Sequence, residues 1–136
     1  YARVLHDPAG GLARLQARTA PYPDALATAL RTRFEWEATF ALENARKSLE
    51  RADVSYLAGC VFRSIACLCQ VLFALNGVYL LNEKGAVTAV DGFARRPVDF
   101  ARRVTGLYAD LGGGAHATAL DRLGTLIGEA GDLWPP

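Results

Sequence analysis

Polar residues that could take part in recognition appear abruptly where a long apolar segment of the chain ends. Residues 54–75 are almost wholly apolar, and Asn76, Tyr79, Asn82 and Lys84 follow directly. Short loops that emerge from a rigid element often carry binding residues. We therefore expect Tyr79, Asn82 and Lys84 to be functional. Capping of helix ends is the alternative explanation for Asn76 and Asn82.

A polar seam runs along the apolar segment itself. It consists of Tyr56, Cys60, Arg63, Cys67 and Gln70. Their three- and four-residue intervals place them on one face of a helix. Arg63 needs an anion there, because an unpaired buried guanidinium is costly. That anion is either an acidic side chain on the preceding helix, Glu37 or Glu43, or a phosphate or substrate in a cleft.

The chain carries no complete catalytic apparatus. Two-metal phosphoryl transfer needs converging carboxylates, and there is no D-x-D motif. Glu35 and Glu37 have that spacing but lie in a predicted helix, where residues two apart point in different directions. The glycine triplet at 112–114 lacks the lysine and Ser/Thr of a phosphate-binding loop. We expect neither catalytic residues nor a metal site.

Four arginines, at positions 95, 96, 102 and 103, bracket the start of a predicted helix. They could contact phosphates. We expect a solvated face instead, with Asp99 paired to Arg103 one helical turn later.

Composition limits the classes of protein to consider. The chain has 136 residues, of which 51% are hydrophobic, and a formal net charge of +1. This length suits one domain with a real core. No charge-free apolar run reaches the roughly 20 residues of a membrane span. The near-neutral charge makes nucleic acid an unlikely partner. The three cysteines fall in one predicted helix, which favours a reducing, cytoplasmic location.

Periodic apolar residues predict an all-α protein, an antiparallel up-and-down helix bundle of four to five main helices. Asp53 and Asn82 are expected N-caps, and Pro97 suits the first turn of a helix. The expected helices cover residues 9–18, 24–30, 33–52, 54–75, 83–90, 98–111 and 117–130.

Four stretches of the chain carry a resemblance to a known family. They are Val4-Leu5-His6-Asp7-Pro8, Leu42-Glu43-Asn44-Ala45-Arg46-Lys47 with the following Arg51-Ala52-Asp53, Gly59-Cys60-Val61-Phe62-Arg63, and residues 73–87. Over roughly residues 2–108 the pattern resembles the C-terminal helical domain of nucleotidyltransferases of the DNA polymerase β superfamily, including the aminoglycoside type.

This resemblance implies that the chain is one half of an enzyme. In such enzymes an N-terminal α/β domain binds magnesium and a nucleoside triphosphate. The helical domain closes one wall of the cleft and helps to bind a small-molecule acceptor. By this resemblance Glu37 is a cleft-facing carboxylate and Arg63 an anion contact. The wall residues would be Asn76, Tyr79 and Lys84.

The resemblance also sets expectations for the domain organisation. Residues 1–8 would be the edge of the catalytic domain, or else a disordered or helix-leading terminus. Residues 9–136 would be the helical bundle. The glycine-serine and paired-acid signatures of the catalytic domain are absent. Alone, this chain should not transfer nucleotides, and cofactors would bind only to the longer enzyme.

A second class of function stays open. Related helical domains of the HEPN type include ribonucleases with an arginine followed four to six residues later by histidine, and this sequence has no such pair. A nuclease is therefore disfavoured. A non-catalytic interaction module survives, which would form a homodimer or bind a partner protein or nucleotide.

Overall fold

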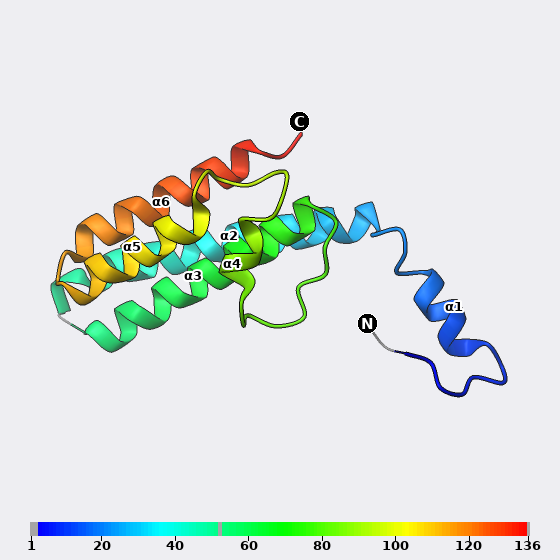
Figure 1. The fold of residues 1–136 in the computed structure, drawn as a ribbon. Coiled ribbons are helices and arrows are strands. Elements are labelled where there is room, and N and C mark those ends of the chain that lie inside the picture. The colour runs from blue at the N-terminus through cyan, green and yellow to red at the C-terminus, as the bar shows by residue number, and fades with distance from the viewer. Residues whose placement is uncertain (1–2, 52, 136) are drawn as a thin grey trace.

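The computed structural model describes residues 3–51 and 53–135, and within them every regular element is helical. The four long helices are α2 (Asp24–Ser48), α3 (Val54–Leu75), α5 (Phe100–Gly112) and α6 (His116–Asp132). They run alternately up and down, with α2 and α3 beside α5 and α6 (Figure 1). The expected all-α bundle is confirmed. Of the N-terminal segment expected to edge another domain, Tyr1 and Ala2 lie outside the described residues.

Two short helices complete the fold. Helix α4 (Ala86–Val90) packs against α3 and α5, whereas α1 (Gly11–Ala17) stands apart from the bundle (Figure 1). No residue of α1 is buried. The bundle core is therefore built without it.

Helix α3 lies at the centre of the core. It begins where predicted, because the Asp53 carboxylate accepts a hydrogen bond from the Tyr56 N–H at 3.0 Å. It ends at Asn76 and Gly77, where Gly77 takes a positive φ of 65° that suits glycine. Leu68 and Leu72 are fully buried between the other helices.

Helix α3 is also long and apolar enough to cross a membrane, with a mean hydropathy of 1.9 over its most apolar window. However, 61% of that window is buried inside the bundle. Burial against neighbouring helices accounts for its apolar surface, as in the core helix of a soluble protein.

Helix α2 is one continuous element, and the expectation of two separate helices at 24–30 and 33–52 is wrong. No glycine or proline interrupts residues 24–48, so the helix has no reason to break. Ala38, Ala41 and Ala45 are buried on this helix, where small side chains let another helix approach closely. Ser64 of α3 donates a hydrogen bond to the Ala38 carbonyl at 2.8 Å.

The segment after α3 differs from the prediction at two helix starts. Asn82 does not cap a helix at residue 83. Its side chain accepts from the Lys84 N–H at 3.0 Å, and α4 begins only after Gly85, whose φ is 74°. The Asn82 amide therefore closes a local turn and caps no helix.

Helix α5 starts at Phe100, two residues later than expected, and Pro97 lies outside it. The preceding Asp99 has φ of 54°, which is not helical. A distant side chain helps to cap α5, because the Ala101 N–H donates to Asp91 Oδ1 at 3.2 Å. Local sequence gave no sign of this tertiary contact.

An ion pair joins α5 to α6. Arg103 donates to both carboxylate oxygens of Glu129, at 2.6 and 2.7 Å. The expected pairing of Arg103 with Asp99 is wrong, since Asp99 pairs with Arg102 instead. A two-pronged guanidinium–carboxylate contact fixes geometry as well as charge. Hydrogen bonding to Arg103 holds the pKa of the Glu129 carboxyl below its usual value.

This ion pair predicts a pH-dependent stability difference. Glu129→Gln should lower the free energy of unfolding at pH 7 by about 0.5–1 kcal/mol, the upper range for partly exposed pairs. Because the folded-state pKa of Glu129 is depressed, its contribution is present above the unfolded pKa near 4.3 and lost as the pH falls through the folded value. Urea unfolding of both proteins from pH 7 to pH 3 measures the difference.

A Glu50→Gln variant, at an exposed carboxylate, is the control and should match the parent protein. A Glu129→Gln deficit that stays constant down to pH 3 would contradict the assignment.

Candidate functional site

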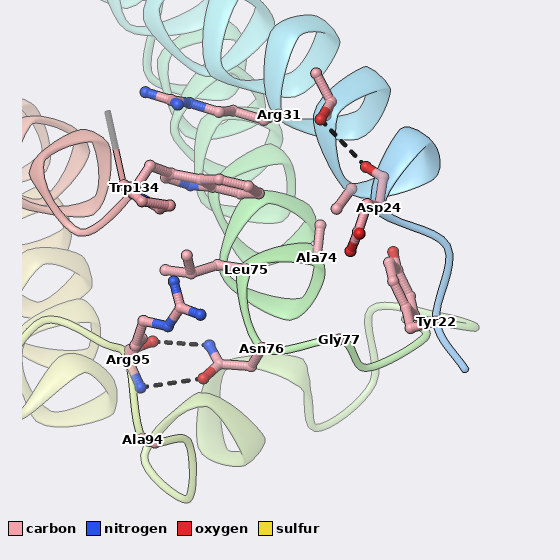
Figure 2. Close-up of a pocket in the computed structure, with 13 residues that line it drawn as sticks. Tyr22, Asp24, Arg31, Ala74, Leu75, Asn76, Gly77, Ala94, Arg95 and Trp134 are labelled. Carbon is pink, nitrogen blue, oxygen red and sulfur yellow. Dashed lines mark hydrogen bonds between the residues drawn. The ribbon is translucent and has the colours of Figure 1, made fainter. Parts of the chain in front are cut away.

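A cleft with a volume of about 770 Å³ lies at one end of the bundle. Its walls come from the start of α2, the end of α3, the loop before α5 and the segment after α6 (Figure 2). The connector from α1 enters the bundle at this same end (Figure 1). Segments far apart in sequence therefore meet around one opening.

One wall of the cleft combines a cation with an aromatic ring. The Arg31 guanidinium lies 5.0 Å from the centre of the Trp134 ring, and its Nε donates to Glu35 at 3.2 Å. Figure 2 shows Trp134 between Arg31 and Leu75. The Trp134 Nε1–H is buried and has no acceptor among the described residues. Most buried polar groups have a hydrogen-bond partner. The unpaired Trp134 N–H is therefore an unusual feature of this wall of the cleft.

Asn76 holds the opposite wall in place. Its amide donates to the carbonyls of Leu72 and Arg95, each at 2.8 Å, and accepts from the Arg95 N–H at 3.0 Å. The bond to Leu72 is the helix-end contact that capping predicts. The two bonds to Arg95 fasten the loop before α5 to the end of α3 (Figure 2). Asn76 thereby positions Arg95 at the cleft.

Two tyrosines attach the α1–α2 connector to the bundle. The rings of Tyr22 and Tyr79 are 4.5 Å apart, and the Tyr79 hydroxyl donates to the Thr19 carbonyl at 3.1 Å. Tyr22 lines the cleft, and Tyr79 supports it from behind. Burial, and then the neighbouring Tyr79, raise the pKa of Tyr22. At neutral pH its hydroxyl is therefore protonated and available as a donor.

Glu37 and Arg63 meet each other on a different face. Arg63 Nε donates to Glu37 Oε1 at 3.0 Å, so the acidic partner on the preceding helix is present. The Arg63 side chain is 59% exposed, and the expectation of a buried guanidinium on the seam is wrong. Arg63 lies at the exposed edge of the contact between α3 and α2, where it lines two surface grooves. Neither residue lines the cleft beside Asn76.

Lys84 is exposed in the loop before α4, and its side chain forms no ion pair within residues 3–51 and 53–135. Of the five predicted site residues, Asn76 lines the cleft and Tyr79 supports it. Glu37 and Arg63 form a separate pair.

Sequence reasoning missed the cleft residues Arg31 and Trp134. They are far apart in the chain, and neither belongs to a recognisable motif. For Arg95 the sequence favours a solvated face over a phosphate contact, whereas the structure places it at the cleft. Within the described residues, no group of three or more His, Cys, Asp or Glu side chains could hold a metal ion. The cleft offers the guanidinium of Arg95 and the hydroxyl of Tyr22 as donors, which suit an anionic or oxygen-rich ligand.

Comparison with protein families gives one match, to a domain of unknown function, DUF4037, over residues 1–84. The chain belongs to the DUF4037 family. The matched region covers α1, α2, α3 and the loop up to Lys84, so it includes Tyr22, Arg31 and Asn76. The remaining cleft residues of this DUF4037 protein, Arg95 and Trp134, lie beyond it. The comparisons with curated proteins and with solved structures found no match.

The clamp formed by Asn76 predicts a linked loss of stability and loop order. Asn76→Ala should lower the free energy of unfolding by about 1–2 kcal/mol, because three partly exposed hydrogen bonds are lost. Hydrogen exchange of the backbone amides at 93–96 should accelerate at the same time. Denaturant unfolding and exchange mass spectrometry measure the two effects.

Asn82→Ala is the matched control, since Asn82 makes one local bond in an exposed turn. It should leave exchange at residues 93–96 unchanged. Equal exchange in parent and Asn76→Ala proteins would show that the loop is held by other contacts.

Proposed function

We propose that this chain is the substrate-binding helical domain of a nucleotidyltransferase, with the cleft forming one wall of the nucleotide and acceptor site. The observation that carries the proposal is the position of the cleft. It opens at the end of the bundle where the α1 connector enters, and it presents the cations Arg31 and Arg95.

The chemistry of the cleft supports an anionic ligand. Arg95 forms no ion pair within the described part of the chain, so its guanidinium is available for a phosphate. Arg31 is already bonded to Glu35 and stacked on Trp134, which orients it. Asp24 lines the same cleft and could contact the amino group of an acceptor. A cleft with both charges suits two substrates of opposite charge.

The exposed leucines of helix α1 are a second argument for a partner domain at this end of the bundle. Its Leu12 and Leu15 side chains are 49% and 58% exposed, and none of its residues is buried. A helix that exposes leucines gains stability by packing them against another surface. In the proposal that surface belongs to the N-terminal catalytic domain of the same protein. That domain supplies the metal-binding carboxylates and holds magnesium and the nucleoside triphosphate, and this chain alone is inactive.

Binding to the cleft can be followed by the fluorescence of Trp134. In a Trp36→Phe background, Trp134 is the remaining tryptophan. We expect a saturable fluorescence change with Mg-ATP, another nucleoside triphosphate or an aminoglycoside. For the triphosphates, Arg95→Gln should weaken binding about tenfold, because a charged hydrogen bond contributes about 1.5–3 kcal/mol. The substitution keeps the backbone bonds of residue 95 to Asn76.

Arg96→Gln is the matched control. Arg96 is the adjacent arginine, its guanidinium bonds to the Phe93 carbonyl, and it does not line the cleft. Equal weakening by both variants would indicate non-specific attraction. No fluorescence change with any of these ligands would count against a ligand wall in this domain.

A second candidate, self-association, is favoured by the outer face of α2 and α3. Two grooves of about 520 and 460 Å³ adjoin there and share Phe40 and Arg63. Trp36, Phe40 and Tyr56 are exposed on this face by 65%, 45% and 51%. The Trp36 and Phe40 rings stack at 5.0 Å. Exposed aromatic side chains in one patch are typical of protein interfaces. The occupant in this alternative is a second copy of the chain.

Sedimentation velocity over a range of concentrations tests this alternative. If the face joins two copies, the parent protein should form dimers, and a Trp36→Ser, Phe40→Ser double variant should be monomeric. Phe62→Ser is the control, because Phe62 is 56% exposed on another side of α3. A parent protein that stays monomeric at every concentration would exclude self-association through this face.

A further inference from the structure

The indole ring of Trp134 fills a flat slot in one wall of the cleft. Figure 2 shows the ring between the Arg31 guanidinium and the Leu75 side chain, and the guanidinium lies 5.0 Å from the ring centre. A guanidinium over one face of a ring and an aliphatic side chain over the other suit planar aromatic groups in general. Because an indole fits between them, the slot has the dimensions for a bicyclic ring.

Trp134 is an imperfect occupant of this slot. Its Nε1–H is buried and has no acceptor among the described residues. A buried donor without a partner loses the hydrogen bond that it would make with water, which opposes its burial. Release of the ring into solvent would restore that hydrogen bond. The packing that holds Trp134 is therefore weakened by its own N–H group.

The segment that carries Trp134 is short and follows the end of a helix. Helix α6 ends at Asp132, and the Trp134 N–H donates to the Gly131 carbonyl at 3.3 Å. The end of α6 contains Gly128 and Gly131, and glycine lowers the stability of a helix. A Cβ atom at Gly128 would meet nothing within 4 Å, so packing does not require glycine there. The end of α6 and the tail at 133–135 therefore form a segment of low local stability.

The rest of the cleft offers groups for the phosphates of a nucleotide. Arg95 lines the same cleft and forms no ion pair within the described residues. The bond from Arg31 to Glu35 uses Nε, and within residues 3–51 and 53–135 the two Nη groups of Arg31 donate no hydrogen bond. Guanidinium groups with free N–H donors bind phosphate well. Two cations and a ring slot thus line one opening.

We propose that the slot between Arg31 and Leu75 binds the base of a purine nucleotide, and that the tail closes the site until the nucleotide displaces Trp134. The tail is then an autoinhibitory segment, with the indole in the place of the base. This inference rests on the proposed function, because it names where the base of the nucleotide lies. A ligand with phosphates and no ring cannot replace the indole and meets only the cations.

The first test follows Trp134 in the Trp36→Phe background, with acrylamide as a quencher of its fluorescence. Saturating Mg-ATP should increase quenching, because the indole leaves the slot and enters solvent. Mg-tripolyphosphate carries the same number of phosphates without a base and should leave quenching unchanged. A nucleotide that binds over a stationary Trp134 would instead reduce quenching.

The second test removes the occupant. Trp134→Ala should tighten Mg-ATP binding about tenfold in titration calorimetry, because a mostly closed site loses apparent affinity in proportion to its open fraction. Mg-tripolyphosphate binding should not change. Trp134→Phe is the matched control, since it keeps a ring in the slot, and it should not tighten Mg-ATP binding. Circular dichroism and thermal unfolding establish that both variants fold. If Trp134→Ala does not fold, the quenching result decides the proposal by itself.

Failure of this inference differs from failure of the proposed function. Mg-ATP binding with unchanged or reduced quenching would overturn the inference and leave the cleft as a nucleotide wall. So would an equal increase in quenching with Mg-tripolyphosphate, since phosphate alone would then release the tail, or a folded Trp134→Ala variant that binds Mg-ATP no tighter. If neither ligand binds to the parent protein or to folded Trp134→Ala, the proposed function is wrong and the inference falls with it.

Discussion

The burial of α3 is the constraint on which the rest of the structure depends. This helix is apolar around most of its circumference, so it is stable in water only when other helices cover it. Ala38, Ala41 and Ala45 provide a small-residue surface on α2, and the Ser64 bond to the Ala38 carbonyl joins the two helices. Helix α6 and the short α4 cover further sides. The outer face of α2 and α3 is what remains exposed.

The cleft follows from how this packing ends. Because α3 stops at Asn76 and Gly77, its last turn is a platform on which three other segments meet. Asn76 binds the loop that carries Arg95, while the contact between the Tyr22 and Tyr79 rings fixes the connector to α1. Side chains that position a binding site are themselves held in place by packing and hydrogen bonds. A ligand and a neighbouring domain could therefore both bind at the end of α3.

Ion pairs in this protein mostly join different helices. Arg103 and Glu129 connect α5 to α6, Arg63 and Glu37 connect α3 to α2, and Arg46 reaches Asp121 of α6 at 3.0 Å. Such exposed pairs contribute little energy individually. They do select which helix faces which neighbour. They also occupy several of the cations, whereas Arg95 and Lys84 are among the basic side chains that form no ion pair within the described residues.

The sequence by itself determined the fold class and the span of α3 with its Asp53 cap, because these depend on periodicity and nearby neighbours. It left the anion that pairs with Arg63 open, and the tertiary structure decided for Glu37. Tertiary structure decided the continuity of α2, the cap that Asp91 provides for α5, and the partner of Arg103. It also decided the cleft, since Arg31 and Trp134 share no local pattern and meet only when α6 packs along α2. Local propensity acts over a few residues, whereas a site assembled from four segments depends on how whole helices pack.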